Sequence, residues 1–132
     1  MDETYAYFAV VGSGMYAIVS ERLGLGPSRA WNEGDPKPSG GTYSFMRWCL
    51  ETDIGHDRPV QEHLEVLLPI LEDHAEAIRS LAPQYEAVIQ CVGYFGEPSP
   101  GFHLDAPTIA RIAALGLAVD FDLYSMGSRD DG

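Results

Sequence analysis

The chain has 132 residues, 45% of them hydrophobic and 21% charged, which is typical of one soluble globular domain with a substantial core. Its formal net charge of −12 at pH 7 repels phosphate backbones and anionic lipid, so we expect neither nucleic acid nor a membrane surface as a partner. A basic protein or a cationic ligand suits this charge better, and the absence of a basic-then-apolar first segment predicts a cytoplasmic chain.

The first fifty residues alternate between strand-like and glycine-rich segments. In chain order they predict a buried strand at 5–11, a turn at 12–14, a short helix ended by Gly24, an extended piece at 28–32, a loop at 33–41 and a strand at 42–51. The short helix presents one apolar face, made of Met15, Ile18, Val19 and Leu23. In the last strand, alternation places Met46, Trp48 and Leu50 on one side, opposite Arg47 and Cys49.

The longest regular pattern is helical and spans residues 59–81. Its apolar positions recur at steps of three and four, which places them on one face: Val60, Leu64, Leu67, Leu68, Leu71, Ala75, Ile78 and Leu81. At ~100° per residue, five acids fall on the opposite face: Glu62, Glu65, Glu72, Asp73 and Glu76. Pro69 projects from the acidic face, where the carbonyl that it leaves unpaired is solvated, so we expect a kink rather than a break.

The remaining elements complete an α+β fold. We expect a long strand at 85–95, a third helix opened by Asp105 and ended by Gly116, and a last strand at 117–124. The order predicts a ferredoxin-like βαββαβ unit with an additional C-terminal αβ, in which helices cover one face of a mainly antiparallel sheet. Residues 1–124 then form a single domain, and residues 125–132 form a flexible C-terminal tail.

Several short sequence motifs, taken in their order along the chain, resemble those of a known bacterial family. Leu23-Gly24-Leu25 is followed by Pro27, then by Trp31-x-x-Gly34-Asp35-Pro36, a second tryptophan at Trp48, His63-Leu64 in the long helix, and Asp120-Phe121-Asp122-Leu123-Tyr124 at the end. Over nearly the whole chain this is similar to domain of unknown function 4279. The resemblance implies no established activity and no catalytic residues. Some members resemble neighbours of bacterial toxin genes, which suits an immunity- or antitoxin-like role.

One motif is typical of dinucleotide sites. The segment from Gly12 to Ala17 reads G-x-G-x-x-A after a strand and before a helix. A second parallel strand ending in an acid is also needed, and the segment before Glu33 and Asp35 is a poor core strand. We therefore interpret this motif as a plain glycine turn capped by Ser13, and predict no nucleotide cofactor.

The other candidate groups form no recognisable catalytic or metal site. His63 and His74 share a helix edge but lie ~16 Å apart, so they cannot hold one metal, and we expect both to be partly exposed. Two clusters of acids and histidines show no spacing that is typical of metal ligands, and we interpret them as solvated turns. They are Asp53, His56 and Asp57, and His103 with Asp105, Asp120 and Asp122. Cys49 and Cys91 lie inside strands with no basic group placed to activate a thiol. We predict no catalytic, cofactor-binding or metal-binding residue.

The acidic helix face remains as the candidate site. Acids three and four residues apart on a helix repel one another, and Arg79 is the only positive charge within 59–81. We therefore predict a non-catalytic binding module that masks a basic protein through Glu62, Glu65, Glu72, Asp73 and Glu76. An alternative is a small-molecule-binding or enzymatic domain that uses an aromatic and glycine-rich cleft around Trp31, Trp48, Tyr94 and Phe95. The sequence predicts no particular oligomeric state.

Overall fold

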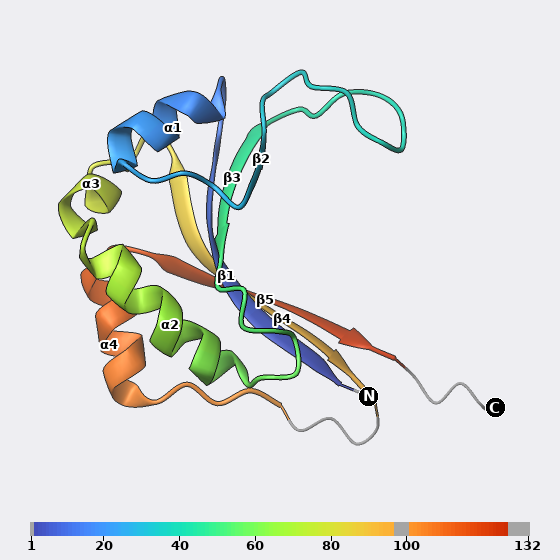
Figure 1. Ribbon diagram of the computed structural model, residues 1–132, viewed down its shortest axis with the longest axis vertical. Helices are drawn as coiled ribbons and strands as arrows, with labels where there is room; N and C mark the ends of the chain where they lie inside the picture. The colour runs from blue at the N-terminus through green and yellow to red at the C-terminus, as the bar shows by residue number, and fades with distance from the viewer. Residues whose placement is uncertain (1, 97–100, 127–132) are drawn as a thin grey trace.

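The computed structural model of the chain describes residues 2–96 and 101–126. These residues form five strands and four helices (Figure 1). The elements are β1 Glu3–Gly12, α1 Tyr16–Leu23, β2 Arg29–Trp31, β3 Met46–Glu51, α2 Val60–Glu72, α3 Ala75–Arg79, β4 Glu86–Phe95, α4 Ala106–Ala114 and β5 Ala118–Ser125.

The strands form one open sheet in the order β2-β3-β1-β4-β5. The pairs β2–β3, β3–β1 and β1–β4 are antiparallel. The strands β4 and β5 run parallel, because α4 carries the chain back to the end of the sheet at which β4 begins. The predicted α+β class with a mainly antiparallel sheet is therefore confirmed. Figure 1 shows the helices on one side of the sheet, as the sequence predicts.

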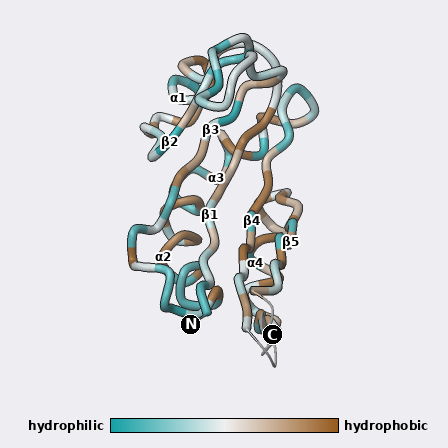
Figure 2. The backbone as a smooth tube through the Cα atoms, turned by 90° about the vertical axis from the view of Figure 1, so that its right-hand side faces the viewer, coloured by the Kyte–Doolittle hydropathy of each residue, from teal (hydrophilic) through white to brown (hydrophobic). Residues whose placement is uncertain are grey.

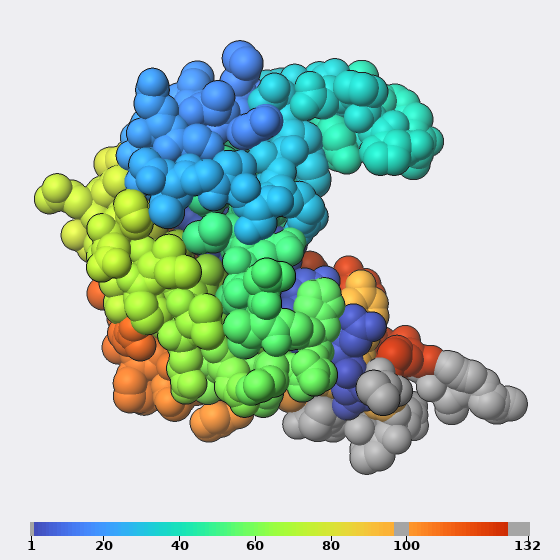
Figure 3. Space-filling model, in the orientation of Figure 1, coloured from blue at the N-terminus to red at the C-terminus, as the bar shows by residue number. Residues whose placement is uncertain are grey.

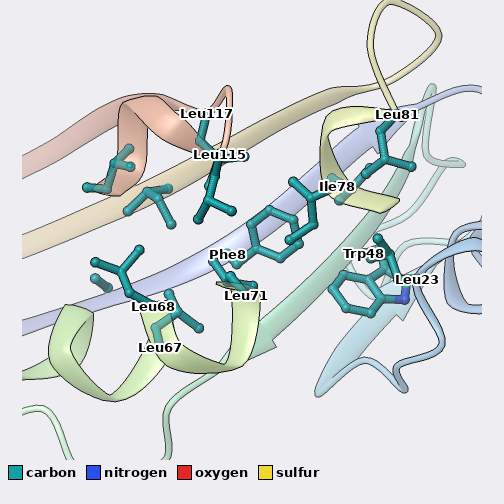
Figure 4. Packing of buried hydrophobic residues seen from close by; sticks show 14 of the residues in the cluster. Phe8, Leu23, Trp48, Leu67, Leu68, Leu71, Ile78, Leu81, Leu115 and Leu117 are labelled. Atoms are coloured by element: carbon teal, nitrogen blue, oxygen red, sulfur yellow. The ribbon is translucent and has the colours of Figure 1, made fainter. Parts of the chain in front are cut away.

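The core lies between the helices and that face of the sheet. Alternation along β1 sends Phe8 and Val10 toward the helices, whereas Tyr7 and Ala9 join a smaller cluster on the opposite face. From α2, Leu71 lies beside Phe8 (Figure 4). The backbone in Figure 2 shows the same pattern, with hydrophobic residues along β4 and at intervals along α2.

The predicted helix at 59–81 is two helices, α2 and α3, and the expectation of one continuous helix is wrong. Pro69 stays inside α2, as expected of a proline on the exposed face. The break comes at His74, whose backbone (φ −123°, ψ 26°) is not helical and whose N–H bonds the carbonyl three residues back, that of Leu71, at 2.9 Å. The change of direction allows Ile78 and Leu81 to enter the same core as Leu71.

Three local expectations also need correction. In α1 only Val19 and Leu23 are buried, while Met15 and Ile18 are 55% and 47% exposed, because α1 covers only one end of the sheet. The strand predicted at 42–51 begins at Met46, and the residues before it belong to the β2–β3 connection, which projects from the body of the molecule (Figure 3). Ser125, predicted to begin the C-terminal tail, ends β5, and residues 127–132 of the predicted tail lie outside the described part.

Candidate functional site

Two of the five acids predicted as a partner-binding face are already neutralised within the chain. Arg58 Nη1 lies 2.6 Å from Glu62 Oε1, a pair one helical turn apart. Arg111, from α4, donates two hydrogen bonds to the Glu72 carboxylate, at 2.7 and 2.6 Å. These hydrogen bonds hold the pKa of Glu72 below its ordinary value. Arg79, the only positive charge within 59–81, forms an ion pair with none of these acids in the described part of the chain, and its Nη1 donates to the Ala114 carbonyl at 3.2 Å.

The other three acids form no ion pair within the described part of the chain, although Arg111, which is bonded to Glu72, also attracts Glu65. Glu65, Asp73 and Glu76 are exposed, and no ion pair reaches them from residues 2–96 or 101–126. Glu65 accepts a hydrogen bond from Gln61 Nε2 at 3.2 Å, which leaves its charge in place. The free part of the acidic face thus runs from the middle of α2, past its end, to the first turn of α3.

The glycine turn before α1 has its N–H groups engaged by the chain itself. Gly14 N–H donates to Glu33 Oε1 and Tyr16 N–H donates to Asn32 Oδ1, each at 2.9 Å. The N-cap of α1 is Met15, whose side chain forms no capping hydrogen bond, and the side chain that accepts from the first turn is that of Asn32, so the predicted capping by Ser13 is wrong. Glu33 and Asn32, from the segment after β2, occupy the positions that a pyrophosphate needs at such a turn.

His63 is buried in the core of the fold, so the expectation of a partly exposed ring is wrong. The residue is only 2% exposed, and the Nδ1 atom of its ring lies 2.6 Å from Thr52 Oγ1. Nε2 is fully buried and has no hydrogen-bond partner in the described part of the chain. The steps 60, 63, 64, 67 place His63 on the apolar stripe of α2, and this spacing is the sequence signal for its burial. His74, by contrast, is half-buried at the helix break.

A cavity of about 110 Å³ lies beside this ring. It is lined by residues of β1, the end of β3, the following loop and α2: Tyr5, Ala6, Glu51, Thr52, Asp53, Gly55, His56 and His63. The ring of Tyr5 stacks on that of His56, with centroids 4.0 Å apart. Asp53 and His56 are exposed in the loop after β3, as predicted, and both also line this cavity together with His63.

Burial makes His63 a source of pH-dependent stability. Burial lowers the pKa of the ring from its ordinary 6.5, and the backbone carbonyls of Gly55 and Thr4 oppose this only partly. Between the lowered pKa of the folded ring and about pH 6.5 the unfolded chain therefore binds more protons than the folded chain, and stability falls as pH falls through this range. We expect the free energy of unfolding, measured with urea between pH 7.5 and 5, to decline more steeply in the wild type than in His63→Gln. Parallel curves for the two proteins would contradict this assignment.

The remaining sequence candidates are dispersed. Burial raises the pKa of both cysteine thiols, that of Cys91 to about 12, so neither is a thiolate near neutral pH. Among the described residues, no three His, Cys, Asp or Glu side chains are arranged to hold a metal ion. The aromatic residues of the alternative cleft lie apart in separate pairs: Trp31 with Tyr43, Trp48 with Phe8, Tyr94 with Tyr124, and Phe95 with Phe102.

Comparison with known proteins identifies a family. The family model described as "Domain of unknown function (DUF4279)" matches residues 2–126. No curated protein and no solved structure matches the chain. Within the described ranges, none of the helices has the length and apolar character needed to cross a bilayer.

Proposed function

The chain belongs to the DUF4279 family, whose description assigns no activity, and we propose from its surface that it is a non-catalytic binding module that masks a basic protein partner. The proposed docking surface consists of the acids that form no ion pair among the described residues, Glu65, Asp73 and Glu76, together with the neighbouring paired Glu62 and Glu72. The proposed setting is the cytoplasm, in an immunity- or antitoxin-like role.

The observation that supports this proposal is the uneven pairing of the acids. Two of the five have arginine partners within hydrogen-bond distance, whereas the other three form no ion pair among the described residues: Glu65 in α2, Asp73 at its C-terminal end and Glu76 in α3. Like charges close together on one surface repel, and a basic partner would relieve that repulsion. With a chain charge of −12, the field also accelerates encounter with a cationic surface at low salt.

The finer fold assignment is also our inference. We infer a ferredoxin-like arrangement for the first four strands, extended by α4 and β5. The strand order β2-β3-β1-β4, with antiparallel neighbours throughout, supports it. In this arrangement one sheet face carries all four helices, and the acidic face points away from the sheet toward solvent.

Charge reversal tests the proposed surface. The partner is first captured from native cytosol and identified by mass, and its association rate is then measured between about 20 and 300 mM salt. For the variant with Glu65, Asp73 and Glu76 changed to lysine, we expect association at low salt to slow at least tenfold, because steering at such surfaces spans 10–10³-fold. The matched control reverses Glu21, Glu86 and Asp120, which are exposed elsewhere and change the net charge equally.

The two triple variants distinguish docking on the acidic face from general attraction by the net charge of the chain. If the acidic face is the docking surface, the control triple variant loses only the part of the rate that follows net charge, and it retains the complex lifetime. Equal losses in the two triple variants, or capture of no basic protein, would contradict the proposal. Circular dichroism of each variant establishes that the fold is intact before the rates are compared.

A further inference from the structure

We propose that the outer edge of β5, from Ala118 to Tyr124, binds an extended segment of another protein in which apolar and basic residues alternate. The segment adds to the five-stranded sheet as a further strand. This edge is separate from the acidic face of α2 and α3, because α4 bonds to α2 through Arg111 and Glu72 and forms a groove with β5. The inference concerns a different partner and does not depend on the docking proposed for the acidic face.

β5 is a long strand at one edge of the sheet (Figure 2). It has 8 residues, whereas β2 at the opposite edge has 3. Proteins commonly keep edge strands short, which limits their pairing with other chains. Within residues 2–96 and 101–126, no further strand and no backbone hydrogen bond reaches the outer side of β5 between Ala118 and Tyr124. This side of β5 is therefore open to pairing with an added strand.

The ladder with β4 shows which backbone groups point outward. Met126 N–H donates to the Phe95 carbonyl at 2.7 Å, in register with the parallel pairing of the two strands. Because the N–H and C=O groups of successive residues point to opposite sides of a strand, Val119, Phe121 and Leu123 direct theirs away from β4. Evenly spaced donors and acceptors of this kind are the groups to which an extended peptide adds by β-augmentation.

The helix-covered face of this edge is apolar. Val119 and Phe121 form a groove with Ile109, Ile112 and Ala113 of α4, and its volume is about 280 Å³. Phe121 is 50% exposed and Ile109 is 53% exposed, so the groove is open to solvent. Every second side chain of an added strand falls on this face of the sheet. Apolar residues at alternate positions of the segment therefore suit the groove.

The other face of the same edge is acidic. Asp120 and Asp122 alternate with the apolar residues along β5, and both are exposed. Asp122 accepts a hydrogen bond from Gln90 Nε2 at 2.6 Å, and neither aspartate forms an ion pair in the described part of the chain. Opposite charges that face each other on neighbouring strands attract, so basic residues at the other positions of the segment complement this face.

A second copy of the chain suits this edge less well. Antiparallel pairing of two β5 strands about Asp120, Phe121 or Asp122 places aspartates of the two copies opposite one another, and like charges in that arrangement are destabilising. Each copy also carries a net charge of −12. A basic segment avoids both sources of repulsion, so the charges favour it over self-association.

Peptide titration tests the site directly. The probe is the amidated peptide Val-Lys-Val-Lys-Val-Lys with an N-terminal fluorescein, and we expect anisotropy at low salt to give a dissociation constant of about 10–100 µM. The same peptide with glutamate in place of lysine is expected to bind at least tenfold more weakly. With the lysine peptide bound, the amides of Val119, Phe121 and Leu123 are expected to exchange hydrogen at least tenfold more slowly, and that of Asp122, which faces β4, to change little.

Methylation of the peptide backbone distinguishes strand addition from attraction by charge. One peptide is N-methylated at its three lysines and another at its three valines, so both keep the same charge and side chains. In an added strand only one of these sets directs its N–H groups at β5. We therefore expect one methylated peptide to lose at least tenfold in affinity and the other to bind as before. Loss in the valine set indicates antiparallel addition, and loss in the lysine set indicates parallel addition.

Variants of the chain locate the binding on β5. Asp120→Asn combined with Asp122→Asn is expected to weaken the lysine peptide about threefold or more, since exposed ion pairs are individually weak. The matched pair Asp73→Asn and Glu76→Gln is expected to leave its affinity unchanged, which separates this edge from the acidic face of α2 and α3. All four changes preserve side-chain shape, and circular dichroism checks the fold.

Four results overturn the proposal. They are equal affinities of the two N-methylated peptides, binding of the glutamate peptide as tight as that of the lysine peptide, equal weakening by the two pairs of substitutions, and a dimer of the free chain in sedimentation that the lysine peptide does not dissociate. The last result assigns the edge to a second copy. None of these measurements uses the partner proposed for the acidic face, so the two proposals fail independently.

Discussion

Replacing Trp48 by alanine is expected to lower the free energy of unfolding by about 3–5 kcal/mol. Trp48 is fully buried at the centre of β3, and its ring meets that of Phe8 edge to face, with centroids 5.9 Å apart. Its indole N–H donates to Ser20 Oγ at 2.9 Å, so the buried polar atom is satisfied by α1. Truncation removes the apolar burial, the aromatic pair and the link between β3 and α1 together.

Urea denaturation of Trp48→Ala and Trp31→Ala measures this effect against a matched control. Trp31 is only half-buried and stacks on Tyr43 beside the β2–β3 connection, so its removal is expected to cost no more than about 1.5 kcal/mol. Ser20→Ala separates out the hydrogen bond, whose loss is expected to cost about 0.5–1.5 kcal/mol. Similar losses for the two tryptophans would mean that the core is not centred on β3.

The parts of the fold that were predictable are those in which a local period decides burial. The three- and four-residue steps through α2 identify its buried face, and the alternation through β3 sends Trp48 and Cys49 to opposite sides. Asp105 caps α4 as expected, accepting a hydrogen bond from Thr108 N–H at 2.9 Å. In each case the residues that decide the structure lie within one or two turns of one another.

Features that depend on distant elements were not predictable in this way. The break at His74 follows the path of the sheet beneath α2 and α3, and the exposure of Ile18 reflects how little of the sheet α1 covers. Neither depends on the period of its own helix. The pairing of β5 with β4 requires the α4 crossover to return along the same edge, which apolar pattern alone does not specify.

The candidate sites also combine features that local sequence predicts with features that depend on distant elements. The acidic face was visible from spacing, but Arg111 lies 39 residues from Glu72, so its neutralising role required the packing of α4 on α2. The burial of His63 could have been read from its place on the apolar stripe of α2. The cavity beside it could not, because it forms where one ladder of the sheet ends and a loop with two positive-φ residues arches over the gap.

Truncation of Leu71 to alanine is expected to lower the free energy of unfolding by about 2–5 kcal/mol. Leu71 is fully buried in the last turn of α2 and lies beside Phe8 of β1, at the point where the helix turns toward α3 (Figure 4). The surrounding side chains come from the sheet and from α2 and α3, so the cavity left by truncation cannot collapse without moving a whole element.

Ile70 is the matched control because it precedes Leu71 on the same helix and is 37% exposed. Ile70→Ala removes a side chain of similar size and is expected to cost about 1 kcal/mol or less, since its loss opens no enclosed cavity. Urea denaturation of both variants at pH 7.5, where His63 is neutral in the folded and unfolded chains, keeps protonation out of the comparison. Equal losses for Leu71→Ala and Ile70→Ala would mean that α2 presents a different face to the sheet, and the acids assigned to solvent would then have to be reassigned with it.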